Sequence, residues 1–156
     1  MKRFSLARCL RLLGLALFLV CLFSCRDLSV FCHYEVVDVT GWEQADTCRI
    51  EIPQMPADTV LTVSVSACAS QTYPYQTLPL SMTVCCEGSD SVSENVELSV
   101  FAEQADQRQS SPLTVTTTKR IGEMTFRKDL HYEVRIVHRV AGEALKGIRE
   151  VGLLLF

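Results

Sequence analysis

Hydrophobic and polar residues alternate along most of the chain after residue 33. The clearest case is the stretch 59–69, where Leu61 and Val63 lie on one side of an extended backbone and Thr62 and Ser64 lie on the other. A period of two residues is typical of a β-strand with one buried face. The same pattern predicts strands over residues 34–39, 47–52, 59–69, 78–86, 92–101, 113–118, 124–126, 132–140 and 151–156; the last is nearly all apolar, as in a central strand.

No part of the sequence shows a helical period over about ten residues. Only residues 103–109 and 142–147 suit a single helical turn. About eight short strands separated by turn residues predict an all-β fold, an antiparallel β-sandwich with a jelly-roll-like arrangement. We assign residues 33–156 to this one domain.

The first 24 residues differ in composition from the rest of the chain. Basic residues at Lys2, Arg3, Arg8 and Arg11 precede an apolar run over residues 12–23. A helix of that length reaches only about 18 Å, which is well short of a hydrocarbon core of about 30 Å. A basic head followed by a short apolar run is typical of a secretory signal peptide.

The tetrapeptide LFSC, which ends at Cys25, resembles the lipobox of bacterial lipoproteins. In such proteins the cysteine thiol is acylated and the cysteine becomes the first residue of the mature chain. The resemblance predicts a lipoprotein signal peptide at residues 1–24, lipid attachment at Cys25 and a lipidated tether over residues 25–32. A multiply acylated cysteine holds a domain stably on a membrane. The alternatives are a signal peptide cleaved elsewhere and an uncleaved anchor.

The predicted signal peptide holds four of the 15 basic residues and none of the 18 acidic residues, so the remainder of the chain is distinctly acidic. Nonspecific binding of nucleic acid is therefore disfavoured, because it needs Lys and Arg to neutralise phosphates. Attachment to a membrane through a basic patch is disfavoured for the same reason. The lipid on Cys25 remains as the predicted membrane anchor.

The sequence leaves open whether the cysteines after Cys25 are free thiols or form disulfides. They are Cys32, Cys48, Cys68, Cys85 and Cys86. Their number is odd, so at least one thiol stays unpaired within a monomer. Disulfides can form in an exported chain, and the sequence does not determine their pairing. Cys48 and Cys86 alternate in phase with apolar neighbours, which favours buried free thiols.

Residue patterns typical of catalysis are missing from the sequence. It contains no nucleophile elbow, no P-loop, no dinucleotide-binding glycine motif and no HExxH zinc motif. His138 shares a strand face with Val134 and Ile136, which favours a histidine satisfied in the core over a metal ligand. We therefore expect no catalytic residue, no metal site and no cofactor, in a protein that is not an enzyme.

Aromatic residues mark two other candidate sites. Tyr73 and Tyr75 flank a proline in a loop between two strong strand predictions, and Trp42 precedes another strand. Such rings either stack on a sugar or a protein partner, or fold back to close the end of a sandwich. We favour the second role for Trp42 and for the loop, and we keep Tyr73 and Tyr75 as possible partner contacts.

Several motifs occur in an order that resembles one known family. They are Gly41-Trp42, the strand over 47–52, the Tyr73-Pro74-Tyr75 loop, and the tail motifs IVHR and LKGIREVGL. With a lipobox in front, this series is similar to the gliding motility lipoprotein GldH family of the Bacteroidetes over nearly the whole mature chain. The sequence departs from that family at Ala67-Cys68 and in the stretch 107–112.

The resemblance implies a non-enzymatic envelope lipoprotein of the gliding machinery linked to type IX secretion, with other envelope proteins of that machinery as partners. Tyr73, Tyr75 and the stretch 107–112 are the expected contacts. Only one acidic residue, Asp27, closely follows Cys25, whereas surface-exported lipoproteins of this group commonly carry an acidic cluster there. We therefore expect an outer-membrane protein that faces the periplasm. The alternative function is a lipid-anchored glycan-binding β-sandwich module with Trp42 and the two tyrosines as its platform.

Overall fold

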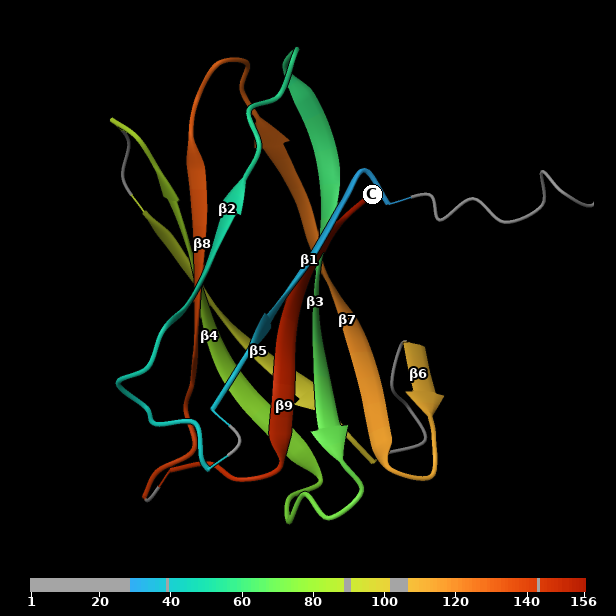
Figure 1. The fold of residues 1–156 in the computed structure, drawn as a ribbon. Coiled ribbons are helices and arrows are strands. Elements are labelled where there is room, and N and C mark those ends of the chain that lie inside the picture. Colours follow the sequence, from blue (N-terminus) through green and yellow to red (C-terminus); the bar gives the residue numbers. More distant parts are fainter. Residues whose placement is uncertain (1–28, 39, 89–90, 102–106, 143) are drawn as a thin grey trace, which may run out of the picture.

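The computed structural model describes residues 29–38, 40–88, 91–101, 107–142 and 144–156 (Figure 1). The predicted signal peptide, Cys25 and the first half of the predicted tether lie outside these ranges. The described residues form these strands: β1 (Phe31–Val36), β2 (Cys48–Ile52), β3 (Thr59–Ser70), β4 (Thr77–Cys86), β5 (Val92–Ser99), β6 (Gln107–Ser110), β7 (Thr114–Phe126), β8 (Tyr132–His138) and β9 (Ile148–Leu155). Within these ranges, no helix is long and apolar enough to cross a membrane.

The strands form two antiparallel sheets that pack face to face (Figure 1). Five strands lie in the order β1-β9-β3-β7-β6, and four lie in the order β2-β8-β4-β5. Without β6, these two orders are those of a jelly roll, in which two Greek keys form the two sheets. The prediction of an all-β, jelly-roll-like antiparallel sandwich is confirmed, and β6 is an additional strand at one edge.

Three segments differ from the sequence predictions. β1 begins at Phe31, so the last two residues of the predicted tether already belong to a strand of the sandwich. The described part of the predicted helical turn at 103–109 is extended instead, because Gln107 and its successors pair with β7. The described part of the predicted turn at 142–147 is not helical either, since Leu145 forms a bridge with Trp42.

A fourth difference concerns β7, which is one continuous strand where the sequence predicts two short ones. Its register against β3 shifts between Gly122, which lies opposite Val63, and Arg120, which lies opposite Ser64. Ile121 is therefore the extra residue of a β-bulge. A bulge changes the phase of the alternation, so the pattern of period two breaks although the strand continues.

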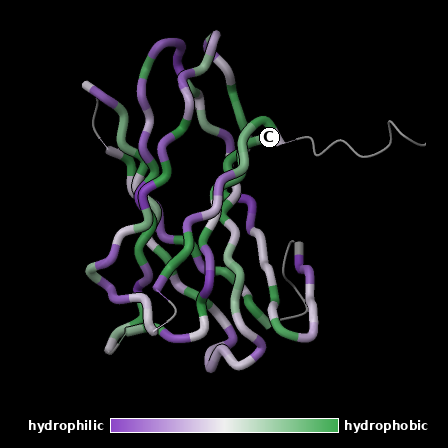
Figure 2. Tube along the Cα trace, viewed as in Figure 1, coloured by the Kyte–Doolittle hydropathy of each residue, from purple (hydrophilic) through white to green (hydrophobic). Residues whose placement is uncertain are grey.

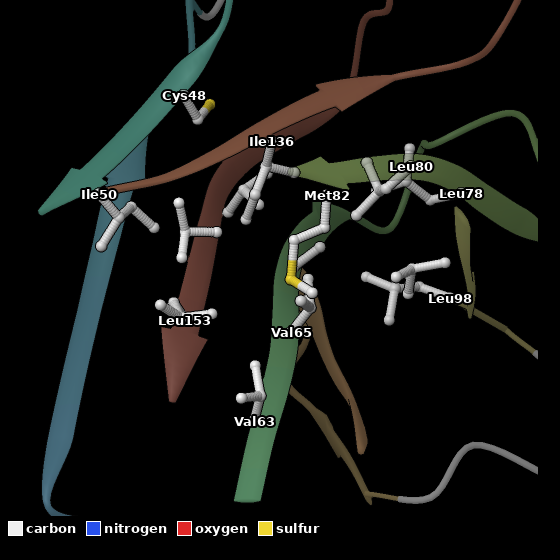
Figure 3. Packing of buried hydrophobic residues seen from close by; sticks show 14 of the residues in the cluster. Cys48, Ile50, Val63, Val65, Leu78, Leu80, Met82, Leu98, Ile136 and Leu153 are labelled. Carbon is white, nitrogen blue, oxygen red and sulfur yellow. The ribbon is translucent and has the colours of Figure 1, made fainter. Parts of the chain in front are cut away.

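Side chains from the inner faces of both sheets form one hydrophobic core (Figure 3). Ile50, Val65, Leu78, Leu98 and Leu153 are completely buried in it. Burial of each such side chain contributes about 1.5–3 kcal/mol, so this layer is the main force that holds the sheets together. Figure 2 shows the alternation of hydrophobic and hydrophilic positions along the strands that supplies this layer.

The strands run between two ends of the sandwich, which we call proximal and distal. The described chain starts at the proximal end, where β9 also finishes at Leu155 opposite Phe31 (Figure 1). The distal end is formed by the residues before β2, the β3–β4 loop, the β6–β7 turn and the β8–β9 loop. At a rise of about 3.4 Å per residue, the 12 residues of β3 separate the two ends by roughly 40 Å.

Candidate functional site: the distal end of the sandwich

Trp42 closes the distal end from the inside and is only 1% exposed. Its amide donates to the Leu145 carbonyl at 2.9 Å, and the Leu145 amide donates back at 2.7 Å. The indole Nε1 donates to the Asp46 carbonyl at 2.8 Å, so the polar atom of the ring is satisfied. In the preceding loop, the amide and hydroxyl of Thr40 donate to the Asp38 carboxylate and lower its pKa. The predicted role of Trp42 as a core residue is confirmed.

His138 packs against Trp42 and is equally buried. The two rings meet edge to face with their centroids 5.0 Å apart. His138 Nε2 lies 3.0 Å from the Trp42 carbonyl oxygen, and because a carbonyl only accepts, Nε2 carries the proton. Within the described part of the chain, Nδ1 has no hydrogen-bond partner. His138 lies with Ile136 on the inner face of β8, and the prediction of a core histidine is confirmed.

The aromatic loop is divided between the interior and the surface. Tyr73 is 4% exposed, and its hydroxyl donates to the Thr77 carbonyl at 3.2 Å. Burial raises the pKa of Tyr73 to about 12, with a smaller contribution from Tyr75. Tyr75 meets Tyr73 edge-on at 5.6 Å between centroids and is 47% exposed. Of the two expected contact residues, only Tyr75 presents its ring to the solvent.

Glycines of the tail motif LKGIREVGL hold neighbouring aromatic rings in place. Gly147 has a φ of +91°, and a Cβ at this position would lie 3.2 Å from the Cα of Tyr73, so only glycine fits there without strain. The Gly147 carbonyl also accepts a hydrogen bond from the Ser70 amide at 2.7 Å. Gly152 lies under the ring of Tyr34, where a Cβ would approach a ring carbon to 2.5 Å. The tail motif and the tyrosine loop are therefore one packed unit.

The second expected contact segment, residues 107–112, lies beside the tyrosine loop. It forms β6 and the start of the β6–β7 turn. Gln71 Nε2, from the β3–β4 loop, donates to the Ser111 carbonyl at 2.7 Å and to Ser110 Oγ at 3.2 Å. The backbone amide of Gln71 donates to the carbonyl of Leu113, and the Leu113 side chain is 74% exposed. The structure thus brings the two segments together, and we call Gln71, Tyr75 and Leu113 the distal patch.

The cysteines after Cys25 are all free thiols, and only Cys48 is buried. Burial raises the pKa of the Cys48 thiol to about 11, with smaller contributions from Glu35 and Asp46, so this thiol is unreactive at neutral pH. Cys32 is exposed on β1, so the expectation of buried thiols is wrong for this residue. The remaining three are half-buried: Cys68, Cys85 and Cys86. Among the described residues, no group of three His, Cys, Asp or Glu side chains is placed to hold a metal ion.

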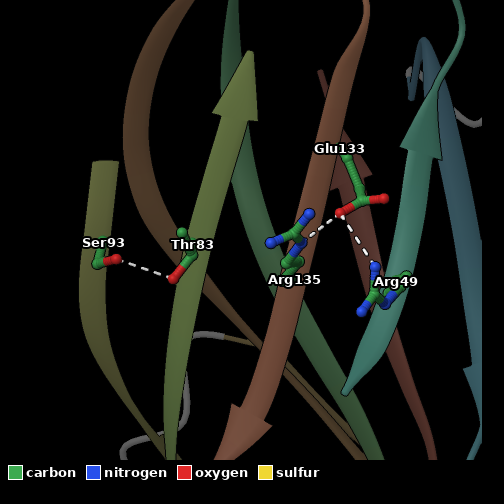
Figure 4. A network of polar contacts seen from close by, with 5 residues as sticks. All are labelled: Arg49, Thr83, Ser93, Glu133 and Arg135. Atoms are coloured by element: carbon green, nitrogen blue, oxygen red, sulfur yellow. Dashed lines mark hydrogen bonds and ion pairs between the residues drawn. The ribbon is translucent and has the colours of Figure 1, made fainter. Parts of the chain in front are cut away.

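The outer face of the four-stranded sheet carries a polar cluster that the sequence analysis missed (Figure 4). Arg49 of β2 lies 4.0 Å from Glu133 of β8, and Arg135 binds the same carboxylate. The bond to Glu133 raises the pKa of the Arg135 guanidinium. A hollow of about 990 Å³ beside the cluster is lined by Phe31 and Cys85 among others. Glu133 and Arg135 are two residues apart on β8 and therefore share its outer face, whereas Arg49 joins them only through the register of β2 against β8, which no spacing in the sequence indicates.

These features define the class of protein: a single jelly-roll domain whose distal loops are fixed by buried aromatic residues and carry exposed apolar side chains. A family model described as GldH lipoprotein matches residues 29–155, and the chain belongs to this family. The family resemblance drawn from the motifs is confirmed, and membership implies a lipid-anchored protein of the cell envelope. Comparison with curated proteins and with solved structures gave no match.

Proposed function

We propose that this protein is a non-enzymatic component of, or accessory to, the gliding motility machinery linked to type IX secretion, and that it docks onto other envelope proteins through the distal patch. Membership in the GldH lipoprotein family supports its place in the envelope. The observation that carries the docking is the position of Tyr75 and Leu113, which are exposed at the end of the sandwich opposite the start of the described chain.

The distal patch combines exposed apolar side chains with a fixed backbone. Tyr75 stands on the buried ring of Tyr73, and Gln71 ties its loop to the β6–β7 turn. Aromatic residues are enriched at protein contacts, and a loop that is already ordered loses little entropy when a partner binds. This geometry suits a preformed contact with a folded partner.

In this proposal the chain is acylated at Cys25 on the outer membrane and the domain faces the periplasm. Only three residues lie between Cys25 and residue 29, where the described chain starts, so the acyl chains hold the proximal end close to the bilayer. The distal patch then points away from the membrane, toward other envelope components. Palmitate labelling that persists in Cys25→Ala would contradict the acylation site, and digestion of the domain by protease on intact cells would contradict the periplasmic orientation.

The glycan-binding alternative receives less support. A glycan-binding platform here requires the exposed rings of Trp42, Tyr73 and Tyr75, and the rings of Trp42 and Tyr73 are buried. A single exposed ring is a poor stacking surface for a sugar, so we do not propose this function.

The test is a cross-linked pull-down of the tagged, full-length protein from native envelopes, with the captured proteins identified by mass spectrometry. The double variant Tyr75→Ser with Leu113→Ser should lose the gliding or type IX secretion components that the unmodified protein captures. Val92→Ser is the matched control, because Val92 is 62% exposed but begins β5 at the proximal end. Equal capture by the double variant would exclude the distal patch, and capture of unrelated proteins alone would exclude the motility role.

A further inference from the structure

Three exposed apolar side chains gather at the proximal end on the outer face of the five-stranded sheet. Val30, Val60 and Phe156 are 63%, 59% and 41% exposed. Phe156 and Thr62 exchange backbone hydrogen bonds of 2.9 and 3.1 Å, and the Val30 amide donates to the Leu155 carbonyl at 2.7 Å. Val30 and Phe156 are thus neighbours across the strands, and Val60 lies diagonally beside Phe156, within reach of its ring. We call these three residues the proximal patch.

The proximal patch does not belong to the core. Leu61 and Leu155, the chain neighbours of two of its members, point inward and are already buried. Because side chains alternate along a strand, Val60 and Phe156 must point outward. Figure 2 shows the hydrophobic stretch of chain beside the C-terminal label. The side chains of the proximal patch therefore stay exposed to solvent in the folded domain and are not buried in its core.

Among the described residues, the acidic side chain on the same row of the sheet as Phe156 and Thr62 is paired with a base. Glu123, which lies opposite Thr62, is paired with Arg120 at 3.1 Å. Arg120 Nη2 also lies 3.4 Å from the Thr62 hydroxyl, so a guanidinium borders the apolar surface. An apolar surface bordered by a basic group is the composition that suits the boundary between acyl chains and anionic headgroups.

We infer that the proximal patch lies against the lipid bilayer, in its interfacial region. This inference rests on the proposed acylation of Cys25. The five peptide steps from Cys25 to Val30 span at most about 18 Å, so an acylated Cys25 keeps Val30 within that distance of the membrane surface. Lipid, rather than a second copy of the chain, is the occupant because the tether brings each copy's own patch to the bilayer. The contact makes the five-stranded sheet lean toward the membrane and fixes the direction in which the distal patch points.

The experiment uses full-length protein purified from its membranes and reconstituted into vesicles of phosphatidylethanolamine and phosphatidylglycerol, with or without bromine on the acyl chains. Bromine quenches nearby tryptophan fluorescence. Val60→Trp places a reporter in the proximal patch, and Leu113→Trp is the matched control at the distal end. Trp42 is buried in both variants and provides a constant background. Phe156→Trp is a second reporter that replaces one aromatic ring by another if Val60→Trp does not fold.

We expect the brominated vesicles to lower the added emission about twofold for Val60→Trp or Phe156→Trp and to leave Leu113→Trp unchanged, since an interfacial side chain reaches roughly 5–10 Å into the headgroup and acyl boundary. If the protein floats with the vesicles but no proximal reporter is quenched more than the control, the inference is wrong while the proposed anchor stands. Unquenched proximal reporters in a cross-linked dimer would assign the patch to a second copy instead. If mass spectrometry finds no acyl group on Cys25, the proposed anchor and this inference fall together.

Discussion

The distal loops and the proximal patch use apolar residues in different ways. At the distal end, Trp42 and Tyr73 turn inward and fix the loops from below. The proximal end has a buried ring pair of its own, Phe126 and Tyr132, but Val30 and Val60 of the proximal patch turn outward from the sheet. The distal loops therefore take their defined shape from the packing of buried rings. A docking surface needs such a defined shape. The proximal surface can be changed with little effect on folding, as suits a contact with lipid.

The largest expected effect comes from removing the ring that closes the distal end. Trp42→Ala should lower the free energy of unfolding by about 3–5 kcal/mol, because it leaves a large cavity in the core. Leu113→Ala, at the same end but 74% exposed, should change it by less than about 0.5 kcal/mol. Urea denaturation of the two variants measures the difference. Equal stabilities would show that the distal loops do not depend on their buried ring.

A smaller loss is expected at the glycine that supports the tyrosine loop. Gly147→Ala should destabilise the fold by roughly 2–3 kcal/mol, since it combines an unfavourable φ with a close approach to Tyr73. Gly142→Ala is the control, because Gly142 also has a positive φ but a Cβ there would meet nothing within 4 Å. The difference between the two variants in thermal denaturation isolates the contact with Tyr73. If Gly142→Ala is as damaging as Gly147→Ala, packing against the loop plays no part.

The sequence allowed the fold class to be predicted because burial on one face of a strand leaves a period of two. It did not reveal β7 as one strand, since the bulge at Ile121 breaks that period and only the partner strand β3 shows that the pairing continues. The burial of Trp42 could be foreseen from its place before a strand. The division between buried Tyr73 and exposed Tyr75 could not, because it depends on Gly147, which is distant in the sequence. The proximal patch likewise exists only through the register of β9 against its neighbours.

Alkaline pH tests the buried state of Tyr73 directly. Its pKa of about 12 exceeds the ordinary value of about 10, so between these values the unfolded chain loses the proton first and the free energy of unfolding falls as the pH rises. A pKa difference of about 2 between the folded and unfolded chains corresponds to about 3 kcal/mol, of which about 2 kcal/mol is lost by pH 12. Tyr73→Phe should remove that part of the fall, and should lower stability at neutral pH by about 1 kcal/mol through loss of the bond to the Thr77 carbonyl.

Denaturation of the unmodified protein and of Tyr73→Phe at several pH values between 8 and 12 measures both the alkaline fall in stability and the loss at neutral pH. Cys48, whose pKa is also raised, contributes a fall in the same direction to both proteins, so the difference between them reports Tyr73 alone. Tyr75→Phe leaves the Tyr73 hydroxyl in place and should retain the alkaline loss. An identical pH dependence for Tyr73→Phe and the unmodified protein would mean that Tyr73 is solvated, and would remove the contrast between the ends.

The smallest expected effect lies at the proximal patch. Val60→Thr keeps the shape and the branched Cβ of the side chain but adds a hydroxyl where 59% of the side chain already meets solvent, so stability in detergent solution should change by less than about 0.5 kcal/mol. Val65→Thr is the matched control on the same strand, because Val65 is completely buried and an unpaired hydroxyl there should cost about 1–3 kcal/mol. If Val60→Thr proved as damaging as Val65→Thr, the proximal patch would be part of the core, and its proposed contact with lipid would lose its physical basis.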